Sequence, residues 1–482
     1  MKTRRFFYFL FIFLIIWPSL RADEVEDITL SIKGGDLYEL VKVLTSPDME
    51  GRLSGHRGYD QAAKWAAAQF KNWGLKPVYD KSFLQFFELS YNEMRETAFS
   101  LILPPKNKEE QPRLAEMKIY KDFCPTLYSG FGEVEAEVVF VGFGLTAPEL
   151  GWDDYISQNV EGKIVATLPG TPRLEGKDFS GYTARAVKII NAKKHGAAGM
   201  ILINRPVVSG SGVYIEGLPM VMVGDEVAKQ LFSTKGYDVD SLRALLRDGH
   251  PLSFSTGVKA RIKHAGAHHP RAATYNVVGM IEGSDPVLKE EYMIFGGHLD
   301  HLGPWPVIHP GANDNASGSV VVMGLARAFS KLEKRPKRSI VFALFAAEEV
   351  GLVGSTYMAE NLPDFPSKPI MMSNHDMNGD GTALFISGSK DYPELYELLL
   401  DVNERYGMNL SLEAGGIQTM GAGSDYAPFV RRGIPTYSTW VRGGGRRNVT
   451  HTAGDSIYVI TPKIMEDIVR LYFAAGYQFL NK

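Results

Sequence analysis

The order of apolar and polar positions predicts alternating helices and strands along most of this 482-residue chain. Near the N-terminus, apolar residues recur at helical spacing over residues 36–44 and 59–73, which predicts two amphipathic helices. Residues 82–89 and 98–103 have the composition and alternation typical of two short strands. Residues 104–113 combine two adjacent prolines with mixed charges and are expected to form an exposed loop.

From about residue 133 the pattern becomes a compact alternation of shorter elements. Strands are expected at residues 138–141, 163–168, 200–203 and 219–223, with helices at 184–195 and 226–232. The turns between them contain no G-x-G-x-x-G sequence, so a dinucleotide site is not supported. The segment 263–270 ends this small α/β unit. We interpret its three histidines, His264, His268 and His269, as part of a solvated hinge rather than a metal site.

After residue 275 strands and helices alternate again over longer segments. The expected strands and helices are 292–295, 316–331, 340–345, a helix after Gly351, and 370–373. Apolar runs separated by amphipathic helices predict an α/β fold in which a mostly parallel sheet has helices on both faces. In such sheets ligands bind beyond the carboxyl ends of the strands.

Composition narrows the possible partners only slightly. Hydrophobic residues make up 45% and charged residues 22% of the chain, which is ordinary for globular proteins, and the length implies two or more domains. The net charge of -3 gives no broad basic field, which argues against nucleic acid or an anionic membrane as the partner. Cys124 is the only cysteine, so it has no partner for an internal disulfide and is expected to be a partly buried apolar residue.

The first 22 residues are expected to be a secretory signal peptide. Lys2, Arg4 and Arg5 precede an apolar run over residues 6–20, and a small residue, Ala22, stands where a signal peptidase could cut. The mature chain would then be exported, either to the periplasm or out of the cell, and would have no membrane contact after cleavage. An uncleaved membrane anchor is the alternative, although about 15 apolar residues are short for a membrane span.

Acidic residues and a histidine follow the predicted strands of the C-terminal region. His298 and Asp300 follow one strand, and Asp376 follows another. Glu348 and Glu349 stand side by side after a third strand, where two carboxylates repel each other unless a cation or a proton lies between them. Because neighbouring side chains of an extended chain point to opposite sides, one can bind a metal while the other serves as a general base.

Asp314 and His451 complete this constellation. Asp314 precedes the helix expected at 316–331, and His451 supplies a second imidazole from a late loop. Two histidines with several carboxylates form a mixed nitrogen and oxygen donor set that suits zinc better than magnesium or calcium. We assign Asp300 to holding the imidazole of His298 or polarising the site. An H-E-x-x-H helix is absent from the sequence, so a single-zinc, thermolysin-like centre is not supported.

Five motifs in this order resemble those of the co-catalytic di-zinc aminopeptidases, the aminopeptidase Y-like family. They are His298-x-Asp300, Gly311-Ala-Asn-Asp314-Asn-Ala-Ser-Gly318, Ala347-Glu348-Glu349-x-Gly351-Leu-x-Gly354-Ser355, Asn374-x-Asp376-Met377 and His451-Thr-x-x-Asp455. The resemblance implies a zinc exopeptidase-like catalytic domain over residues 265–482, with an N-terminal part at 23–132. Residues 133–264 are similar to the protease-associated (PA) domain that many members carry as an insertion.

The resemblance also implies how the residues bind metal. Asp314 resembles the carboxylate that bridges two Zn²⁺ ions. His298 and Asp376 would complete the ligands of one ion. Glu349 and His451 would complete the ligands of the other ion.

Further roles follow from the same resemblance. Glu348 would be the general base, Asp300 would orient the site, and a cis peptide bond is expected between Asp314 and Asn315. A segment on the substrate side would be formed by Ser424, Asp425 and Tyr426. Tyr426 stands where the family usually has a histidine.

These roles imply an exported zinc-dependent aminopeptidase that hydrolyses N-terminal residues from peptides, by metal-activated water with Glu348 as the general base. A carboxypeptidase or an amidohydrolase on the same di-zinc scaffold is an alternative, because Arg442, Arg446 and Arg447 could recognise a carboxylate. A non-catalytic binding protein that holds partners through the PA-like unit is a second alternative, although no metal ligand is missing from the motifs. The loops at 417–420 and 437–440 are expected to shape the side-chain pocket.

Overall fold

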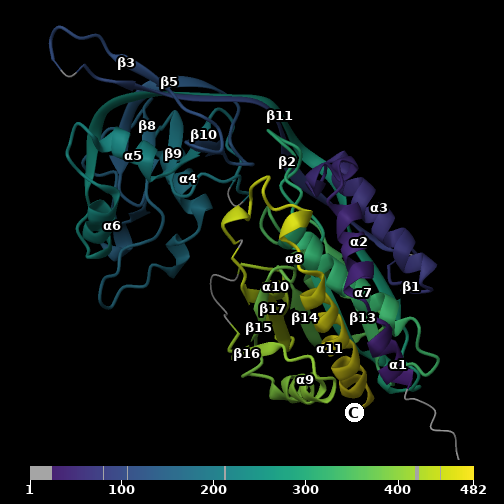
Figure 1. The fold of residues 1–482 in the computed structure, drawn as a ribbon. Coiled ribbons are helices and arrows are strands. Elements are labelled where there is room, and N and C mark those ends of the chain that lie inside the picture. Colours follow the sequence, from purple (N-terminus) through teal and green to yellow (C-terminus); the bar gives the residue numbers. More distant parts are fainter. Residues whose placement is uncertain (1–23, 80, 106, 211–212, 418–422, 446) are drawn as a thin grey trace, which may run out of the picture.

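Two α/β units share one continuous sheet in the computed structural model of the protein (Figure 1). The structure describes residues 24–79, 81–105, 107–210, 213–417, 423–445 and 447–482. The expected signal peptide, residues 1–22, lies outside these ranges. Within the described part of the chain, no helix has the length and apolar character needed to cross a membrane.

The larger unit is built on strands in the order β16-β15-β17-β14-β12-β13-β11. Their bounds are β11 Ser253–Ile281, β12 Glu291–His298, β13 Ser339–Phe345, β14 Lys368–His375, β15 Gly381–Ser387, β16 Ser411–Gly415 and β17 Thr436–Gly443. β12 pairs in parallel with β13 and β14, and β14 pairs in parallel with β17. The carboxyl ends of these strands therefore meet at one end of the sheet.

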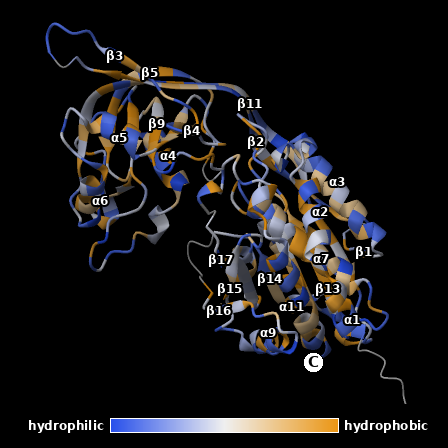
Figure 2. Ribbon diagram, in the orientation of Figure 1, coloured by the Kyte–Doolittle hydropathy of each residue, from blue (hydrophilic) through white to orange (hydrophobic). Residues whose placement is uncertain are grey.

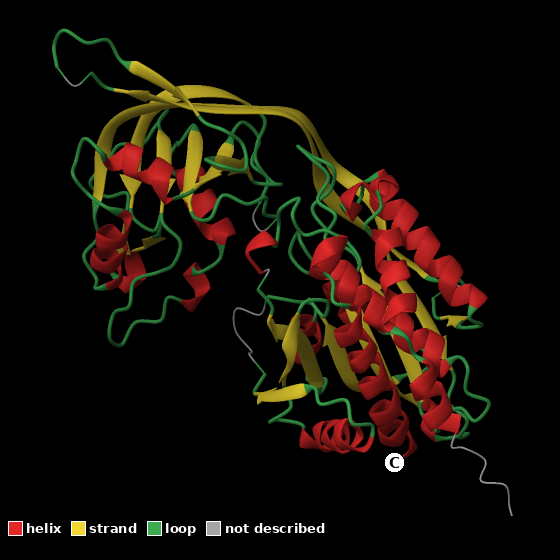
Figure 3. Ribbon diagram, in the orientation of Figure 1, coloured by secondary structure: helices red, strands yellow, loops and turns green. Residues whose placement is uncertain are grey.

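Helices cover both faces of this sheet, as predicted (Figure 3). One hydrophobic core contains side chains from α1 Glu24–Ser31, α2 Gly34–Leu44, α3 Arg57–Asn72, α7 Gly318–Phe329, α9 Pro393–Arg405 and α11 Pro462–Asn481. A second core contains side chains from α8 Val353–Glu360 and α10 Tyr426–Arg431. Side chains along β12 alternate between the cores: Met293 and Phe295 lie in the first, Tyr292 and Ile294 in the second.

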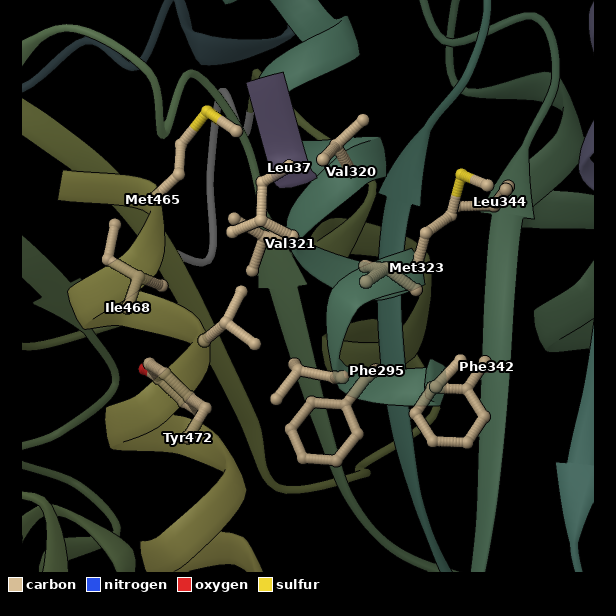
Figure 4. Packing of buried hydrophobic residues seen from close by; sticks show 14 of the residues in the cluster. Leu37, Phe295, Val320, Val321, Met323, Phe342, Leu344, Met465, Ile468 and Tyr472 are labelled. Carbon is tan, nitrogen blue, oxygen red and sulfur yellow. The ribbon is translucent and has the colours of Figure 1, made fainter. Parts of the chain in front are cut away.

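Phe295 lies among the packed side chains of the first core (Figure 4). Its ring is stacked 5.9 Å from Phe342 on the adjacent strand and 6.1 Å from Phe329 of α7, and it meets Tyr472 of α11 edge-on at 6.4 Å. All four side chains are fully buried. These contacts fix α7 and α11 against the strand that ends at His298.

The smaller unit has a parallel sheet in the order β5-β8-β9-β10, with β4 antiparallel at its edge. Its elements are β4 Phe123–Pro125, β5 Gly132–Val141, β6 Thr146–Ala147, β7 Trp152–Asp153, β8 Ile164–Thr167, α4 Arg185–Lys194, β9 Gly199–Ile203, β10 Met220–Val223, α5 Asp225–Phe232 and α6 Val239–Arg247. The strands are hydrophobic in Figure 2, whereas the loop before β3 Arg113–Glu116 is hydrophilic and its described residues are exposed, as predicted. Cys124 is fully buried, whereas partial burial was expected.

Two long strands join the units. β2 Leu84–Leu103 pairs antiparallel with β11 almost end to end, from Leu84 opposite Val277 to Ile102 opposite Lys259. Figure 1 shows this ribbon arching from the larger unit to the smaller one. The two strands expected at 82–89 and 98–103 are therefore one. Cross-strand bonds to β11 satisfy the backbone groups of the polar residues between them, which the local pattern does not reveal.

The solvated hinge expected at residues 263–270 is wrong for the same reason, because the segment lies inside β11. His264 is buried, and its ring nitrogens contact a hydroxyl of β2 at 2.7 Å and a carbonyl of β10 at 3.0 Å. His268 and His269 each stack on a tyrosine ring. The three histidines thus tie β11 to its neighbours.

The other predicted elements agree with the structure within about three residues at each end, except that β5 begins at Gly132 rather than at residue 138. The helices expected at 36–44, 59–73, 184–195, 226–232 and 316–331 are α2, α3, α4, α5 and α7. The strands expected at 138–141, 163–168, 200–203, 219–223, 292–295, 340–345 and 370–373 are β5, β8, β9, β10, β12, β13 and β14. The two-residue strand β1 Lys76–Pro77 pairs with β11.

We predict that Phe295→Ala lowers the free energy of unfolding by about 3 to 5 kcal/mol, because removing a fully buried ring leaves a cavity that its neighbours cannot fill. Denaturant unfolding followed by tryptophan fluorescence measures the change. The matched control is Phe86→Ala on β2, whose side chain is 54% exposed. It should change stability by less than about 1 kcal/mol, and equal effects of the two substitutions would contradict this description of the core.

Candidate metal centre

The carboxyl ends of adjacent parallel strands bring four of the predicted site residues together. His298 is the last residue of β12, and Asp376 follows β14 directly. Glu348 and Glu349 lie in the turn after β13. Because β12 lies between β13 and β14 in the sheet, these side chains converge on one cavity.

Asp314 and His451 reach the same cavity from connecting segments. Asp314 lies in the kinked segment Ala312–Ser317 directly before α7, where its own backbone is not helical, and His451 lies in the loop between β17 and α11. The two carboxylate oxygens of Asp314 face different imidazoles. Oδ1 is 3.4 Å from His298 Nε2, and Oδ2 is 3.1 Å from His451 Nε2. Asp314 therefore lies between the two histidines.

Each of these imidazoles has a second carboxylate beside it. His298 Nε2 is 3.6 Å from Asp376 Oδ1, and His451 Nε2 is 3.2 Å from Glu349 Oε2. The centre thus divides into two half-sites that share Asp314. We call them the His298 half-site, with Asp376, and the His451 half-site, with Glu349. Glu348 lies on the side of the first, its Oε2 3.9 Å from His298 Nε2.

The donor set fits metal ions. Two groups of side chains have ligand atoms close enough to share an ion: His298, Glu348 and Asp376 form one, and His301, Asp314 and Glu349 form the other. Asp376 Oδ1 is buried and accepts no hydrogen bond from the described residues, so a cation beside it would supply the missing partner. Imidazole nitrogens mixed with carboxylate oxygens are donors that suit zinc.

The pKa values of three carboxyl groups in the centre, those of Asp314, Glu349 and Glu348, are shifted in different directions. Burial acts to raise the pKa of Asp314, but His298 and His451 outweigh burial and hold that pKa well below its usual value. Burial also acts to raise the pKa of Glu349, but the nearby imidazoles, chiefly that of His451, outweigh burial and lower this pKa to about 2. At Glu348 burial dominates and raises the pKa well above its usual value. Glu348 is therefore the acid of this group that most readily takes up a proton.

Asp300 holds the turn that carries the two glutamates. Its buried carboxylate accepts hydrogen bonds from the backbone N–H groups of Glu348, at 3.1 Å, and Glu349, at 3.3 Å. The ring nitrogen Nδ1 of His298 is 3.2 Å from the backbone carbonyl of Asp300 and 3.8 Å from its carboxylate. Burial raises the pKa of Asp300 to about 7. One residue thus positions three members of the centre.

Asp455 and Asn315 hold Asp314 in place. The carboxylate of Asp455 accepts hydrogen bonds from the backbone N–H groups of Asn313 and Asp314, both at 2.9 Å. A cis peptide bond joins Asp314 to Asn315, as predicted. The side-chain amide of Asn315 donates to the His375 carbonyl at 3.0 Å and ties this turn to the strand that precedes Asp376.

The Ser424–Tyr426 segment supports the centre through a hydrogen bond to the carboxylate of Asp376. The hydroxyl of Ser424 donates to Asp376 Oδ2 at 2.7 Å and accepts a hydrogen bond from the Asn374 amide at 2.7 Å. Asp425 and Tyr426 are buried, and burial raises the pKa of Asp425 to about 7. Ser424 therefore leaves Oδ1 of Asp376 as the oxygen that faces His298.

His301 is a member of the centre that sequence reasoning missed. It is fully buried, and its Nδ1 lies 2.7 Å from Oε1 of Glu349, the oxygen that His451 does not approach. The sequence offered one signal, since His301 follows Asp300 directly in the first motif.

Arg52 was also missed, because residues 46–52 look only like a turn-rich break between helices. Its guanidinium is fully buried, and burial lowers its pKa to about 10. It donates to four backbone carbonyls at 2.6 to 2.8 Å, those of Leu44, Leu299, Pro310 and Gly311. Arg52 thus fastens the N-terminal helices to the segments that carry His298 and Asp314.

Part of the expected arginine cluster is already engaged. Arg442 Nη1 lies 3.0 Å from Glu413, and its guanidinium stacks 3.6 Å above the ring of Phe385. Arg446, the side chain of Arg447 and residues 418–420 of an expected pocket loop lie outside the described part of the structure. The described geometry of Arg442 therefore does not favour it as a receptor for a substrate carboxylate.

We predict that Arg52→Met lowers the free energy of unfolding by at least about 3 kcal/mol, because four buried carbonyls lose their donor. Thermal or denaturant unfolding measures the change. The control is Arg57→Met in α3, because the Arg57 side chain is exposed and its described ion pair is with Glu50. It should cost much less than Arg52→Met, because exposed ion pairs contribute little to stability. A small effect of Arg52→Met would show that its carbonyl contacts contribute little to the fold.

Comparisons with known proteins agree with this architecture. Among solved structures, an aminopeptidase from Aneurinibacillus sp. strain AM-1 has a TM-score of 0.65 at 23% identity, covering 94% of this chain and 95% of that one. A zinc aminopeptidase from Bacillus subtilis, BSAP, has a TM-score of 0.63 at 20% identity, covering 93% and 96%. At these identities the likeness shows the fold.

Curated relatives match over part of their length. A probable glutamate carboxypeptidase of Arthroderma benhamiae is 27% identical over 407 residues, 68% of this chain and 52% of that protein. An aminopeptidase of Pseudomonas aeruginosa strain UCBPP-PA14 is 27% identical over 315 residues, 58% of this chain and 54% of that protein. The chain thus spans about half the length of these two relatives. The family comparison identifies residues 276–475 as a domain of peptidase family M28 and residues 134–231 as a PA domain.

Proposed function

We propose that this protein is an exported zinc-dependent aminopeptidase that removes N-terminal residues from peptides. The observation that carries the proposal is the position of Asp314, whose two oxygens face the imidazoles of His298 and His451 at 3.4 and 3.1 Å. A carboxylate shared in this way suits a pair of metal ions about 3.5 Å apart, the spacing of two-metal hydrolases. The match of residues 276–475 to peptidase family M28 supports peptides as the substrate class.

The proposed ligands follow the two half-sites. One Zn²⁺ would be held by Asp314 together with His298 and Asp376, and the other by Asp314 together with His451 and Glu349. The pairs of atoms in each half-site already lie 3.1 to 3.6 Å apart, which is the spacing of neighbouring ligands around one ion. His301 and Ser424 would hold the outer oxygens of Glu349 and Asp376, and so leave the other oxygens for the ions.

Glu348 is the proposed general base. When bound, zinc lowers the pKa of a water molecule and polarises the scissile carbonyl. Glu348 would accept the proton of the attacking water on Oε2 and return it to the departing amine nitrogen. The position of Glu348 supports this role, because its side chain lines the cavity and its backbone lies in the turn held by Asp300.

The choice between an aminopeptidase and a carboxypeptidase depends on what the cavity offers a substrate terminus. The carboxylates that line it, those of Asp314, Glu348, Glu349 and Asp376, are the proposed metal ligands and general base. A carboxypeptidase would need, in addition, a free cationic side chain for the substrate carboxylate. Arg442, the described candidate, already pairs with Glu413. We therefore favour the aminopeptidase.

Export is part of the proposal and rests on the sequence of residues 1–22, in which basic residues precede an apolar run. Mass spectrometry of the protein recovered from its host would show the mature N-terminus.

We predict that the purified protein releases the amine from aminoacyl-anilides with a free α-amine, that a chelator abolishes this activity, and that added zinc restores it. Glu348→Gln should lower kcat by about 100- to 10,000-fold, because the proton acceptor is lost while the shape is kept. Bound zinc, measured by elemental analysis, should remain unchanged in the variant. The control is Glu413→Gln on β16. It should keep full activity, because Glu413 is neither a proposed metal ligand nor the proposed base.

The same panel distinguishes the alternatives. N-acetylated anilides and N-blocked dipeptides are included, and the proposed enzyme should leave both intact. Cleavage of the N-blocked dipeptides with release of the C-terminal residue would instead establish a carboxypeptidase. Zinc binding without cleavage of any free-amine substrate would contradict the proposed activity and favour a binding protein.

A further inference from the structure

The smaller unit touches the two segments that carry the ligands of the His451 half-site. Arg205 follows β9 of the smaller unit. One of its guanidinium nitrogens, Nη2, donates to the backbone carbonyl of Thr450 at 3.1 Å and also to that of Asn448. Thr450 directly precedes His451 in the chain. A side chain of the smaller unit therefore holds the backbone of the His451 loop.

A second contact reaches Glu349. The backbone of Gly210 lies so close to the turn after β13 that a Cβ at this position would collide with the Glu349 carbonyl oxygen. Ser209 and Gly210 line the same cavity as His451. Only glycine allows this approach, so the segment fits against the turn that carries Glu349.

This segment is itself fastened to the smaller unit. The backbone carbonyl of Ser209 accepts a hydrogen bond from Leu127 N at 2.9 Å, and its hydroxyl accepts one from Arg185 Nη1 at 2.6 Å. Val208 is buried together with Cys124, beside β10, and with Leu302 of the larger unit. The contact with Glu349 is therefore made by a fixed part of the smaller unit.

The larger unit supports ligands of both half-sites, including Glu349 through Asp300 and His301, but among the described contacts those from the smaller unit reach the His451 half-site. The described contacts of His298 and Asp376 come from the larger unit, through Asp300, Ser424 and the strands that these ligands end or follow. His451 instead lies in a loop and has a φ of 62°, a left-handed conformation that a non-glycine residue keeps only when its surroundings hold it. Arg205 supplies such support from outside the larger unit.

We propose that the PA domain positions one half of the metal centre. Arg205 holds the loop that contains His451, and the Ser209–Gly210 segment packs against the turn that contains Glu349. The ion in the His451 half-site therefore depends on the docked PA domain. The ion in the His298 half-site does not. Arg205 is thus a positioning residue. This inference rests on the proposed two-ion centre, and its test distinguishes the failure of either.

The test measures zinc binding by the full mature chain, with Zn²⁺ alone as the probe. Metal-free protein is titrated in the presence of a competing chelator, and bound zinc is counted by elemental analysis. Arg205→Ala should weaken one of the two ions by about 10- to 100-fold, the usual effect of removing a residue that supports a metal ligand, and leave the other unchanged. Arg261→Ala is the matched control, since this arginine lies on β11 and pairs with Glu133. It should leave both affinities unchanged.

Two ligand variants assign the effect to a half-site. In a His451→Ala background, which retains only the other ion, adding Arg205→Ala should have no further effect. In an Asp376→Ala background it should weaken the remaining ion. Gly210→Ala should act as Arg205→Ala does, because the added methyl pushes against the Glu349 carbonyl. Circular dichroism and the melting temperature of each variant verify that it is folded.

Each outcome has a distinct meaning. A wild-type protein that binds fewer than two zinc ions overturns the two-ion centre itself. Two ions in the wild type with unchanged affinities in folded Arg205→Ala overturn the positioning role while the centre stands. Equal weakening of both ions also overturns it, because the proposed dependence belongs to the His451 half-site alone.

Discussion

The shared carboxylate of Asp314 is the constraint on which the rest of the site depends. In the proposed centre, an acid whose two oxygens face two imidazoles must be held to within about half an ångström, or one of the two proposed ions would lose a ligand. The structure supplies that precision from several directions. Asp455 fixes the backbone at Asp314, Asn315 ties the turn to β14, and α7 begins immediately after it. Both hydrogen bonds are buried, 2.9 to 3.0 Å long, and join a side chain to a backbone group.

The fold explains why so many distant segments can meet at this carboxylate. The loops that follow the parallel strands all lie at one end of the sheet. Arg52 connects the N-terminal helices to these loops, because it donates hydrogen bonds to four backbone carbonyls. The ribbon of β2 and β11 then carries the chain into the smaller unit and back. This ribbon is a paired and continuous element rather than a flexible linker. It can therefore hold the smaller unit in a defined place, with Ser209 and Gly210 at the cavity.

Sequence reasoning was most successful where the signal was local. The alternation of apolar runs and amphipathic helices gave the fold class. Short motifs after strands gave His298, Glu348, Glu349 and Asp376, which the structure brings to one cavity. It failed where the decisive interaction was distant. Residues 263–270 look polar and hinge-like in isolation, and only pairing with β2 explains why they form a strand. His301 and Arg52 were missed because their partners belong to segments that the chain brings together only after folding.

The most direct test of the central assignment is the anomalous scattering of a zinc-loaded crystal, recorded at the zinc absorption edge. We expect two peaks about 3.5 Å apart, on either side of the Asp314 carboxylate. One should lie within bonding distance of His298 and Asp376, and the other within bonding distance of His451 and Glu349. A single peak, or peaks that leave Asp314 bound to one ion only, would contradict the assignment of Asp314 as the bridge between two metals.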